Sequence, residues 1–371
     1  PGWDTVLMFS IRKRREYRFR SMPNCRVLQR TSSMSRKSLA KKTVRAALMV
    51  LAVMATVSVH SRERPNMLVI LADDMGFTDL GAFGGHDIRT PNLDELALEG
   101  IRFTNFHGHA RCAASRALLM SGTGNHEAGF GTVVDIESFR GKRGYEKFLT
   151  RRVVTVAEVL RSGGYRTYIS GKWDLKAQPS KRGFERSMVM MRGGSGHYQA
   201  INPWVRYVHN GKMVQEQDEP TYSTTLFTDS MIGFFEEDSA DTRPYFALYA
   251  PSAPHWPLHF PPGMSQTYTG AYDHGYEELR AQRIKGAEAA GVLPDGIDTG
   301  GYVARAPRWH SLTQEEKATN ARVMEIYAAM ITHLDAEIGR LLDELHDVGA
   351  LDNTLILFIN DNGAEGGPVF R

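Results

Sequence analysis

The sequence predicts an α/β fold with a doubly wound, mainly parallel sheet. Two segments, residues 66–76 and 353–363, are each an apolar run closed by adjacent oxygen-bearing side chains and a glycine. Unbroken apolar runs of this kind are typical of strands that are covered on both faces. Helix signals alternate with strand signals along the chain, and this alternation favours an open sheet that binds ligands at the carboxyl ends of its strands.

Each predicted element has a local reason. The helix over 92–100 follows Pro91 and stops at Gly100, which are common helix boundaries. The longest helix, 313–345, opens on the capping signal Thr-Gln-Glu-Glu and places apolar side chains such as Tyr327 at helical spacing. The other predicted elements are strands over 166–170 and 245–249 and helices over 154–162 and 225–237.

The chain of 371 residues is long enough for one large domain plus an appendage, and the appendage is the first sixty residues. Of the 45 Lys and Arg residues, 13 lie in residues 1–60 beside only two acids, so the remainder is net acidic. A net acidic body argues against nucleic-acid binding, which needs a basic face. Residues 263–311, rich in Gly, Arg and Tyr, are expected to form an excursion from the sheet. The predicted organisation is a leader over 1–60 and one domain over 64–371.

The leader contains an apolar run, residues 46–60, that follows a basic stretch beginning at Met34. This arrangement is typical of a secretory signal peptide, and the run is shorter than the roughly 20 residues of a comfortable membrane span. The end of the run offers no clean cleavage pattern, so a retained membrane anchor stays open beside a cleaved signal peptide. In both cases we expect the secretory pathway and an extracellular or periplasmic protein, with membrane contact only through residues 46–60.

Four oxygen-bearing side chains directly follow the two apolar runs: Asp73, Asp74, Asp361 and Asn362. Three carboxylates and one amide oxygen suit a hard divalent cation such as Ca²⁺ or Mg²⁺ better than zinc, which prefers His and Cys. A single pair of this kind is more often a turn or a cap. Two pairs at equivalent positions of the sheet favour a metal site.

The two cysteines are Cys25, in the leader, and Cys112, so the domain offers no disulfide pair and no Cys-x-x-Cys motif. Cys112 begins an apolar helical stretch, where free N–H groups and the helix dipole favour a developing anion. Arg116, four residues on, returns to the same face one turn later. A buried structural cysteine with a surface arginine is the alternative that these residues alone leave open.

Seven segments, in order, resemble the type I sulfatases, in particular the bacterial alkyl/arylsulfatases. They run from RPNMLVILADDMGFTDLGAFGG through TPNLDELALEGIRFTNFH, CAASR with ALLMSG, GYRTYISGKWDL, RGFERS and APHWPLHFPP to NTLILFINDNGAEG. The resemblance covers residues 64–371. It implies an alkaline-phosphatase-like sheet flanked by helices, and hydrolysis of aryl or alkyl sulfate esters.

The resemblance also implies a role for each matching residue. Cys112 matches the cysteine that a formylglycine-generating enzyme converts to Cα-formylglycine, whose hydrate attacks sulfur and later releases sulfate. Arg116 matches the arginine that steadies the hydrate, Lys172 a sulfate-binding lysine, and His255 the histidine near the leaving-group oxygen. One calcium ion is implied, with Asp73, Asp74, Cys112, Asp361 and Asn362 as its ligands.

Three features depart from the family pattern. Ala114 stands where proline is usual in the modification motif. Asp174 replaces a histidine that normally contacts the nucleophile; two unit charges ~4 Å apart interact by about 4 kcal/mol at an effective dielectric of 20, so this carboxylate is expected to slow turnover. The chain ends at Arg371, before a second active-site lysine and a small C-terminal antiparallel sheet that relatives carry.

Three functions remain open from the sequence. The first is hydrolysis of a small-molecule sulfate ester. The second is hydrolysis of phosphoesters or phosphonates by the same apparatus. The third is a protein that keeps the fold and calcium but is catalytically impaired, because of Asp174 and the missing C-terminal part. His107, His109 and His197 are expected to be structural or to shape the substrate site, and not to act in catalysis.

Overall fold

A computed structural model describes residues 7–11, 64–191, 196–198, 206–214, 221–294, 296–299 and 307–364. The chain divides into two compact units, residues 1–13 with 65–371 and residues 14–64, and every described helix and strand lies in the first. The predicted leader run 46–60 falls outside the described residues. None of the helices in the described part of the chain combines the length and the apolar character that a membrane span requires.

A nine-stranded mixed sheet forms the centre of the first unit. Five adjacent strands, in the order β9-β2-β8-β4-β5, run parallel, and antiparallel strands flank them at both edges. The predicted α/β fold is therefore confirmed. The strands are β1 (Leu7–Ile11), β2 (Asn66–Ala72), β3 (Ile101–Phe103), β4 (Arg166–Lys172), β5 (Arg186–Met190), β6 (Tyr207–His209), β7 (Lys212–Met213), β8 (Tyr245–Ala250) and β9 (Thr354–Asn360).

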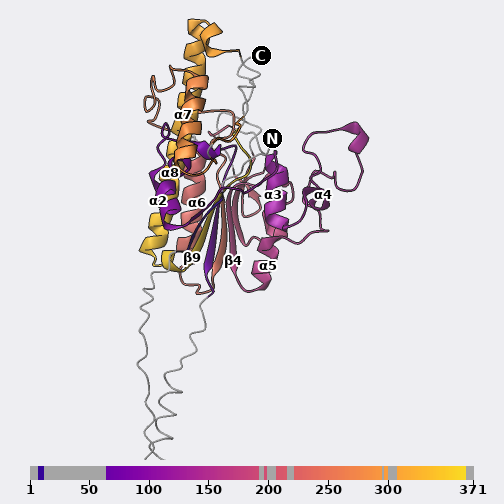
Figure 1. Ribbon diagram of the computed structural model, residues 1–371. Coiled ribbons are helices and arrows are strands. Elements are labelled where there is room, and N and C mark those ends of the chain that lie inside the picture. Colours follow the sequence, from indigo (N-terminus) through magenta and orange to yellow (C-terminus); the bar gives the residue numbers. More distant parts are fainter. Residues whose placement is uncertain are drawn as a thin grey trace, which may run out of the picture. The chain divides into compact units, whose positions relative to one another are not determined.

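Helices cover both faces of the sheet (Figure 1). On one side lie α2 (Pro91–Glu99), α6 (Ser223–Glu237) and α8 (Gln314–Asp347), and on the other α3 (Cys112–Ser121) and α5 (Val156–Ser162). The described helices also include α4 (Asn125–Ala128) and α7 (Tyr276–Ala289). The four helices predicted over 92–100, 154–162, 225–237 and 313–345 all form, with ends shifted by at most two residues.

Side chains of the central strands alternate between the two helical layers. In β2, Leu68 and Ile70 belong to the core beneath α8, whereas Val69 and Leu71 belong to the core beneath α3. Because both layers are apolar, the strand needs hydrophobic residues at consecutive positions. This is the physical reason why the strand appears in the sequence as an unbroken apolar run.

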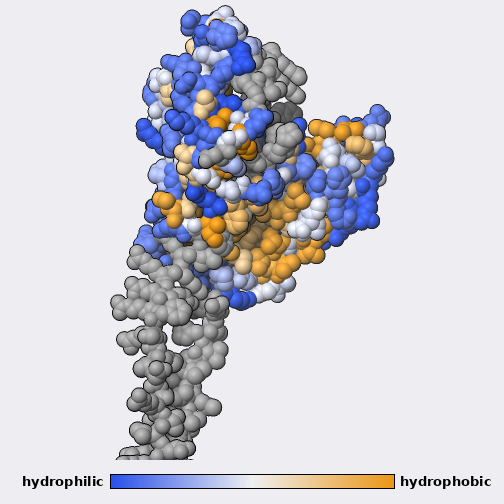
Figure 2. Space-filling model, in the orientation of Figure 1, coloured by the Kyte–Doolittle hydropathy of each residue, from blue (hydrophilic) through white to orange (hydrophobic). Residues whose placement is uncertain are grey.

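The excursion over 263–311 contains a helix, α7, that the sequence did not predict. Its sequence, YEELRAQRIKGAEA, has no continuous apolar stripe, and its region at the upper left of Figure 2 is largely hydrophilic, in contrast to the hydrophobic surface over the sheet. The helix packs through the core residue Leu279 and through close backbone contact. A Cβ atom on Gly286 would lie 2.0 Å from the carbonyl oxygen of Gly84.

Candidate active site

Strands β2 and β9 bring the predicted oxygen donors together. The two strands are adjacent and parallel, and their register places Ala72 opposite Asn360. Asp73 and Asp361 are the next residues, and the Asp361 N–H donates to the Ala72 carbonyl at 3.1 Å. The Asp74 N–H donates to Asp361 Oδ1 at 3.3 Å. Carboxylates almost three hundred residues apart in the chain therefore meet at one edge of the sheet.

Two buried cations lie among these carboxylates. Lys172 ends β4, and its Nζ donates to both oxygens of Asp73, at 2.9 and 2.7 Å. Arg116, on α3, donates from Nε to Asp361 Oδ2 at 2.9 Å, and its Nη2 lies 3.3 Å from Asp73 Oδ1. Burial raises the pKa of Asp73, but Lys172 and Arg116 outweigh it and hold that pKa well below its usual range.

Gly171 precedes Lys172 in β4 and allows this strand to place the Lys172 side chain beside Asp73. Its φ of 128° lies in a region that side chains rarely permit. A Cβ atom there would lie 2.0 Å from the carbonyl oxygen of Ala250 on the neighbouring strand β8. Glycine is therefore required for β4 and β8 to approach so closely beside the site.

Asp74 and Asn362 supply buried oxygens that lack hydrogen-bond donors. Within the described residues, neither Asp74 Oδ2 nor Asn362 Oδ1 accepts a hydrogen bond, although Asn362 Nδ2 donates to the other oxygen of Asp74. Potential metal-binding atoms of Asp73, Asp74, Cys112 and His255 all lie within 4.8 Å of one another. Buried oxygens without donors fit a bound cation.

The balance of charge in the site supports the same interpretation. Three carboxylates, Asp73, Asp74 and Asp361, meet two cations. Burial, reinforced by the charge of Asp73, raises the pKa of Asp74, and the same two causes raise that of Asp361 further. The three carboxylates thus outnumber the two cations, and this surplus of negative charge favours the binding of a cation.

Cys112 is the first residue of α3 and lies beside the carboxylates, with its Sγ 3.7 Å from Asp74 Oδ1. Burial and the neighbouring carboxylates, Asp73 foremost, raise the pKa of the thiol well above its usual range. A thiolate is therefore disfavoured, and unmodified Cys112 is a weak nucleophile. Ser115 Oγ fixes the preceding loop, since it donates to the His109 carbonyl at 2.8 Å and accepts from the His109 N–H at 2.9 Å.

His255 approaches the site from the loop after β8. Its Nδ1 donates to the Trp256 carbonyl, and its Nε2 lies 3.4 Å from Asp74 Oδ2. The His255 carbonyl in turn accepts a hydrogen bond of 2.9 Å from Nε2 of the buried His197, whose Nδ1 lies 3.1 Å from Ser223 Oγ. His197 thus supports the backbone of His255, whereas His107 is exposed and lies 2.7 Å from Asn105.

Asp174 follows β4 by two residues and is half-buried, with a φ of 56°. Aspartate tolerates this left-handed conformation better than most residues. Its carboxylate interacts electrostatically with both Arg116 and Lys172. The structure therefore brings all of the predicted site residues, including Asp174, into one neighbourhood.

The sequence analysis did not single out Asn360, the last residue of β9, which is fully buried. Its Nδ2 donates to the Met75 carbonyl at 2.8 Å, while its Oδ1 has no hydrogen-bond donor in the described part of the chain. The signal was present, because Asn360 directly precedes the Asp361-Asn362 pair at the end of the apolar run.

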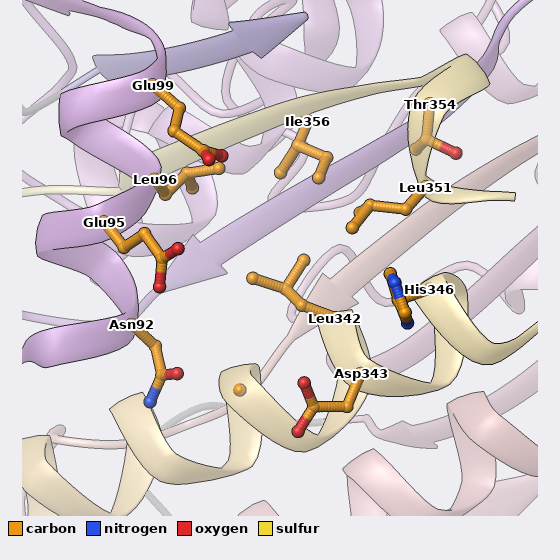
Figure 3. Close-up of a pocket in the computed structure, with 11 residues that line it drawn as sticks. Asn92, Glu95, Leu96, Glu99, Leu342, Asp343, His346, Leu351, Thr354 and Ile356 are labelled. Atoms are coloured by element: carbon orange, nitrogen blue, oxygen red, sulfur yellow. The ribbon is translucent and has the colours of Figure 1, made fainter. Parts of the chain in front are cut away.

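A separate cavity of about 280 Å³ lies between α2, α8 and the start of β9 (Figure 3). Its walls include Glu95, Glu99, Asp343 and Thr354. Thr354 begins the seven-residue strand β9, whose other end adjoins Asp361, so about 20 Å separate this cavity from the metal-ligand candidates. It is not part of the site.

The fold and the site together define an α/β protein of the alkaline-phosphatase-like type, with carboxylates and cations gathered at the carboxyl ends of parallel strands. Residues 65–369 match the sulfatase family. The chain belongs to that family.

Known relatives agree with this membership. The chain is 39% identical to an uncharacterised sulfatase of Schizosaccharomyces pombe over 82% of its own length and 58% of the relative. It is 37% identical to an arylsulfatase of Klebsiella aerogenes over 83% of its length and 68% of the relative. The chain thus spans between about half and two thirds of these two relatives.

Two solved structures share the fold. BT4656 in complex with its substrate D-glucosamine-2-N,6-O-disulfate superposes with a TM-score of 0.60 at 22% identity, over 81% of this chain and 66% of that one. The phosphonate monoester hydrolase of Agrobacterium radiobacter superposes with a TM-score of 0.51 at 24% identity, over 81% and 63%.

Proposed function

We propose that this protein hydrolyses sulfate esters, with Cys112 converted to Cα-formylglycine and one calcium ion bound beside it. The observation that carries the proposal is the meeting of Cys112 with Asp73, Asp74 and His255 within 4.8 Å, at the end of β2. Membership of the sulfatase family and the arylsulfatase relative support the ester class. When present, the two groups would supply a hydrated aldehyde as nucleophile and a positive charge beside the sulfuryl oxygens.

The calcium ion would be held by the carboxylates and amide at the ends of β2 and β9, together with residue 112. Its fit is supported by the buried oxygens of Asp74 and Asn362 that have no donor among the described residues. An all-oxygen set of this kind suits calcium. The residues proposed as ligands are Asp73, Asp74, residue 112, Asp361 and Asn362.

The chain's own side chains would orient and neutralise the substrate. Lys172 and Arg116 fix the carboxylates and add positive charge where negative charge develops on the sulfuryl group. His255 directs Nε2 toward the site. Since Nδ1 uses its own proton to bind the Trp256 carbonyl, His255 would act in its doubly protonated form and give the Nε2 proton to the departing oxygen. Asp174 adds negative charge to the same neighbourhood, and we expect it to slow the reaction.

The proposal also requires partners and a compartment. A formylglycine-generating enzyme would modify Cys112, and a small-molecule sulfate ester would be the substrate. Export through the secretory pathway by way of residues 46–60, by a cleaved signal or a retained anchor, is part of the same proposal.

Phosphonate or phosphoester hydrolysis is the second candidate, favoured by the fold shared with the phosphonate monoester hydrolase. Charge argues against phosphomonoesters as substrates, because their dianions carry more negative charge than sulfate monoesters. Asp174, which is not among the proposed calcium ligands, would repel them more strongly. Sulfate esters are thus the better match.

The test is to co-express the protein with a formylglycine-generating enzyme and to measure two quantities. Intact-mass analysis of the peptide that contains Cys112 should show the loss expected for conversion of the thiol to an aldehyde. The purified protein should then release p-nitrophenol from p-nitrophenyl sulfate, and less from p-nitrophenyl phosphate, in a reaction that EDTA stops and calcium restores.

The control is Cys112→Ala, which should bind calcium weakly and release nothing. A modified protein that prefers the phosphate ester would favour the second candidate. An unmodified Cys112 without turnover of either ester would favour a protein that keeps the fold without catalysis.

A further inference from the structure

The segment that follows the metal-ligand candidate Asp74 is held in an unusual conformation. Asp74 has a φ of 62°, in the left-handed region that few residues other than glycine, asparagine and aspartate adopt. The chain then turns immediately into the short 3-10 helix Phe77–Asp79. The contacts of this turn therefore help to set where Asp74 lies.

Asp79 is the centre of the contacts that do so. Its side chain is almost fully buried, and its Oδ2 accepts the Gly76 N–H at 2.7 Å and the Tyr327 hydroxyl at 2.6 Å. Its Oδ1 accepts from Arg283 Nη1 at 2.5 Å. A buried carboxylate with three donors, one of them a cation, forms a strong and directional anchor.

Tyr327 extends this anchor to Asp74 itself. Its hydroxyl lies 3.3 Å from the Asp74 carbonyl oxygen, in addition to the shorter bond to Asp79. The hydroxyl has a single proton, which the shorter distance assigns mainly to Asp79. The hydroxyl thus touches both ends of the turn that starts at Asp74, without touching any oxygen of the Asp74 carboxylate.

Arg283 connects the anchor to α7. Besides Asp79 it binds both oxygens of Asp87, at 2.9 and 2.6 Å. Gly286 of the same helix also packs closely against Gly84, in the segment between β2 and α2. Asp79 thus links the turn after β2 to α7 and to α8, which are distant in sequence. All three elements meet next to the metal-ligand candidate Asp74.

We propose that Tyr327, acting with Asp79 and Arg283, positions Asp74 for calcium binding. The inference rests on the calcium ion of the proposed function. Groups that orient metal ligands commonly change metal affinity by 10–100-fold when they are removed. Tyr327 is a positioning residue because its hydroxyl contacts the backbone and the anchor of the ligand, not the ligand atoms.

The chain supplies a matched control. Tyr168 on β4 donates its hydroxyl to Asp238 Oδ2 at 2.6 Å, and Asp238 is bound in turn by Arg186 at 2.9 and 2.5 Å. This Tyr-Asp-Arg set has the same chemistry as Tyr327-Asp79-Arg283. It contains none of the metal-ligand candidates. Tyr168→Phe therefore reports the general cost of losing a buried tyrosine hydroxyl.

The experiment is a calcium titration by isothermal calorimetry of the parent protein, Tyr327→Phe and Tyr168→Phe, with thermal unfolding measured in EDTA. We expect Tyr327→Phe to bind calcium 10–100-fold more weakly than the parent and Tyr168→Phe to bind it as the parent does. In EDTA the two variants should lose similar stability, because each gives up one hydroxyl bond to a carboxylate.

The outcomes separate the inference from the proposed function. A parent protein that binds no calcium would refute both. A parent that binds calcium, with a folded Tyr327→Phe of equal affinity, would overturn only the positioning role. Arg283→Gln, at the outer end of the anchor, should weaken calcium binding less than Tyr327→Phe. If Tyr327→Phe and Arg283→Gln both fail to fold, the contacts of Asp79 serve the stability of the fold, and the inference is overturned as well.

Discussion

Ala72 lies opposite Asn360 in the parallel ladder of β2 and β9, so the residues that follow them, Asp73 and Asp361, leave the sheet side by side. This register explains why the site is assembled from both ends of the domain. Neither segment has enough oxygen ligands alone. A shift of the ladder by one residue would turn every side chain of one strand to the opposite face and separate the set.

Asp361→Asn tests the cost of gathering these charges. Burial and Asp73 raise the pKa of Asp361, so ionisation of Asp361 is less favourable in the folded protein than in the unfolded chain. The amide removes that cost and also removes one ligand charge. We expect higher stability in EDTA and at least tenfold weaker calcium binding, measured by urea denaturation and calorimetry.

Asp343→Asn is the matched control, because Asp343 lines the cavity near the opposite end of β9 (Figure 3). It should leave calcium affinity unchanged. If Asp361→Asn binds calcium as tightly as the parent, Asp361 is not a ligand.

Lys172→Met tests the buried ion pair. Lys172 and Asp73 are each only 1% exposed, and their nitrogen and oxygen lie 2.7 Å apart. Methionine fills a similar volume but leaves Asp73 paired with Arg116 alone. In EDTA we expect the free energy of unfolding to fall by about 3 kcal/mol, because one buried charge loses a partner.

The double variant Asp73→Asn with Lys172→Met should regain part of that loss in urea denaturation, since it removes the unpaired charge as well. Equal losses in the single and the double variant would show that the pair is not energetically coupled.

Asp174 can be tested by two substitutions that separate charge from base chemistry. Asn and His both tolerate its left-handed conformation, with a φ of 56°. Asn removes the charge only, whereas His also brings an imidazole. If repulsion of the sulfate limits turnover, both variants should hydrolyse p-nitrophenyl sulfate about tenfold faster, which corresponds to ~1.4 kcal/mol in the barrier.

A gain with Asp174→His alone would indicate that a missing base, not the charge, limits the rate. An unchanged or lower rate in both variants would refute the expectation that Asp174 impairs the reaction.

Strand ends and capping signals were the parts of this fold that the sequence predicted best. The apolar run 66–72 is unbroken because side chains on both faces of β2 are buried, and that requirement is local. Thr313 caps α8 through reciprocal bonds with Glu316, as the capping signal indicated. The site residues come together because they follow such strands.

The sequence did not predict the features that depend on contacts between distant parts of the chain. Helix α7 has a polar sequence and docks through Gly286 and Arg283, neither of which produces a hydrophobic pattern. Tyr327 was assigned to the apolar face of its helix from spacing alone, but its hydroxyl bonds to Asp79. Asp79 is close to Asp74 in sequence, yet only the fold supplies its cation.

His197 provides a test by pH. Burial is the main cause that lowers the pKa of His197 from 6.5 to about 4, so below pH 6.5 the unfolded chain takes up a proton that the folded protein does not. The free energy of unfolding should therefore decrease as the pH falls from 6.5 toward 4. His197→Gln keeps a donor for the His255 carbonyl but cannot titrate. Between pH 7.5 and pH 5 the parent should lose about 2 kcal/mol more than this variant in urea denaturation; parallel losses would show that His197 is not the group responsible.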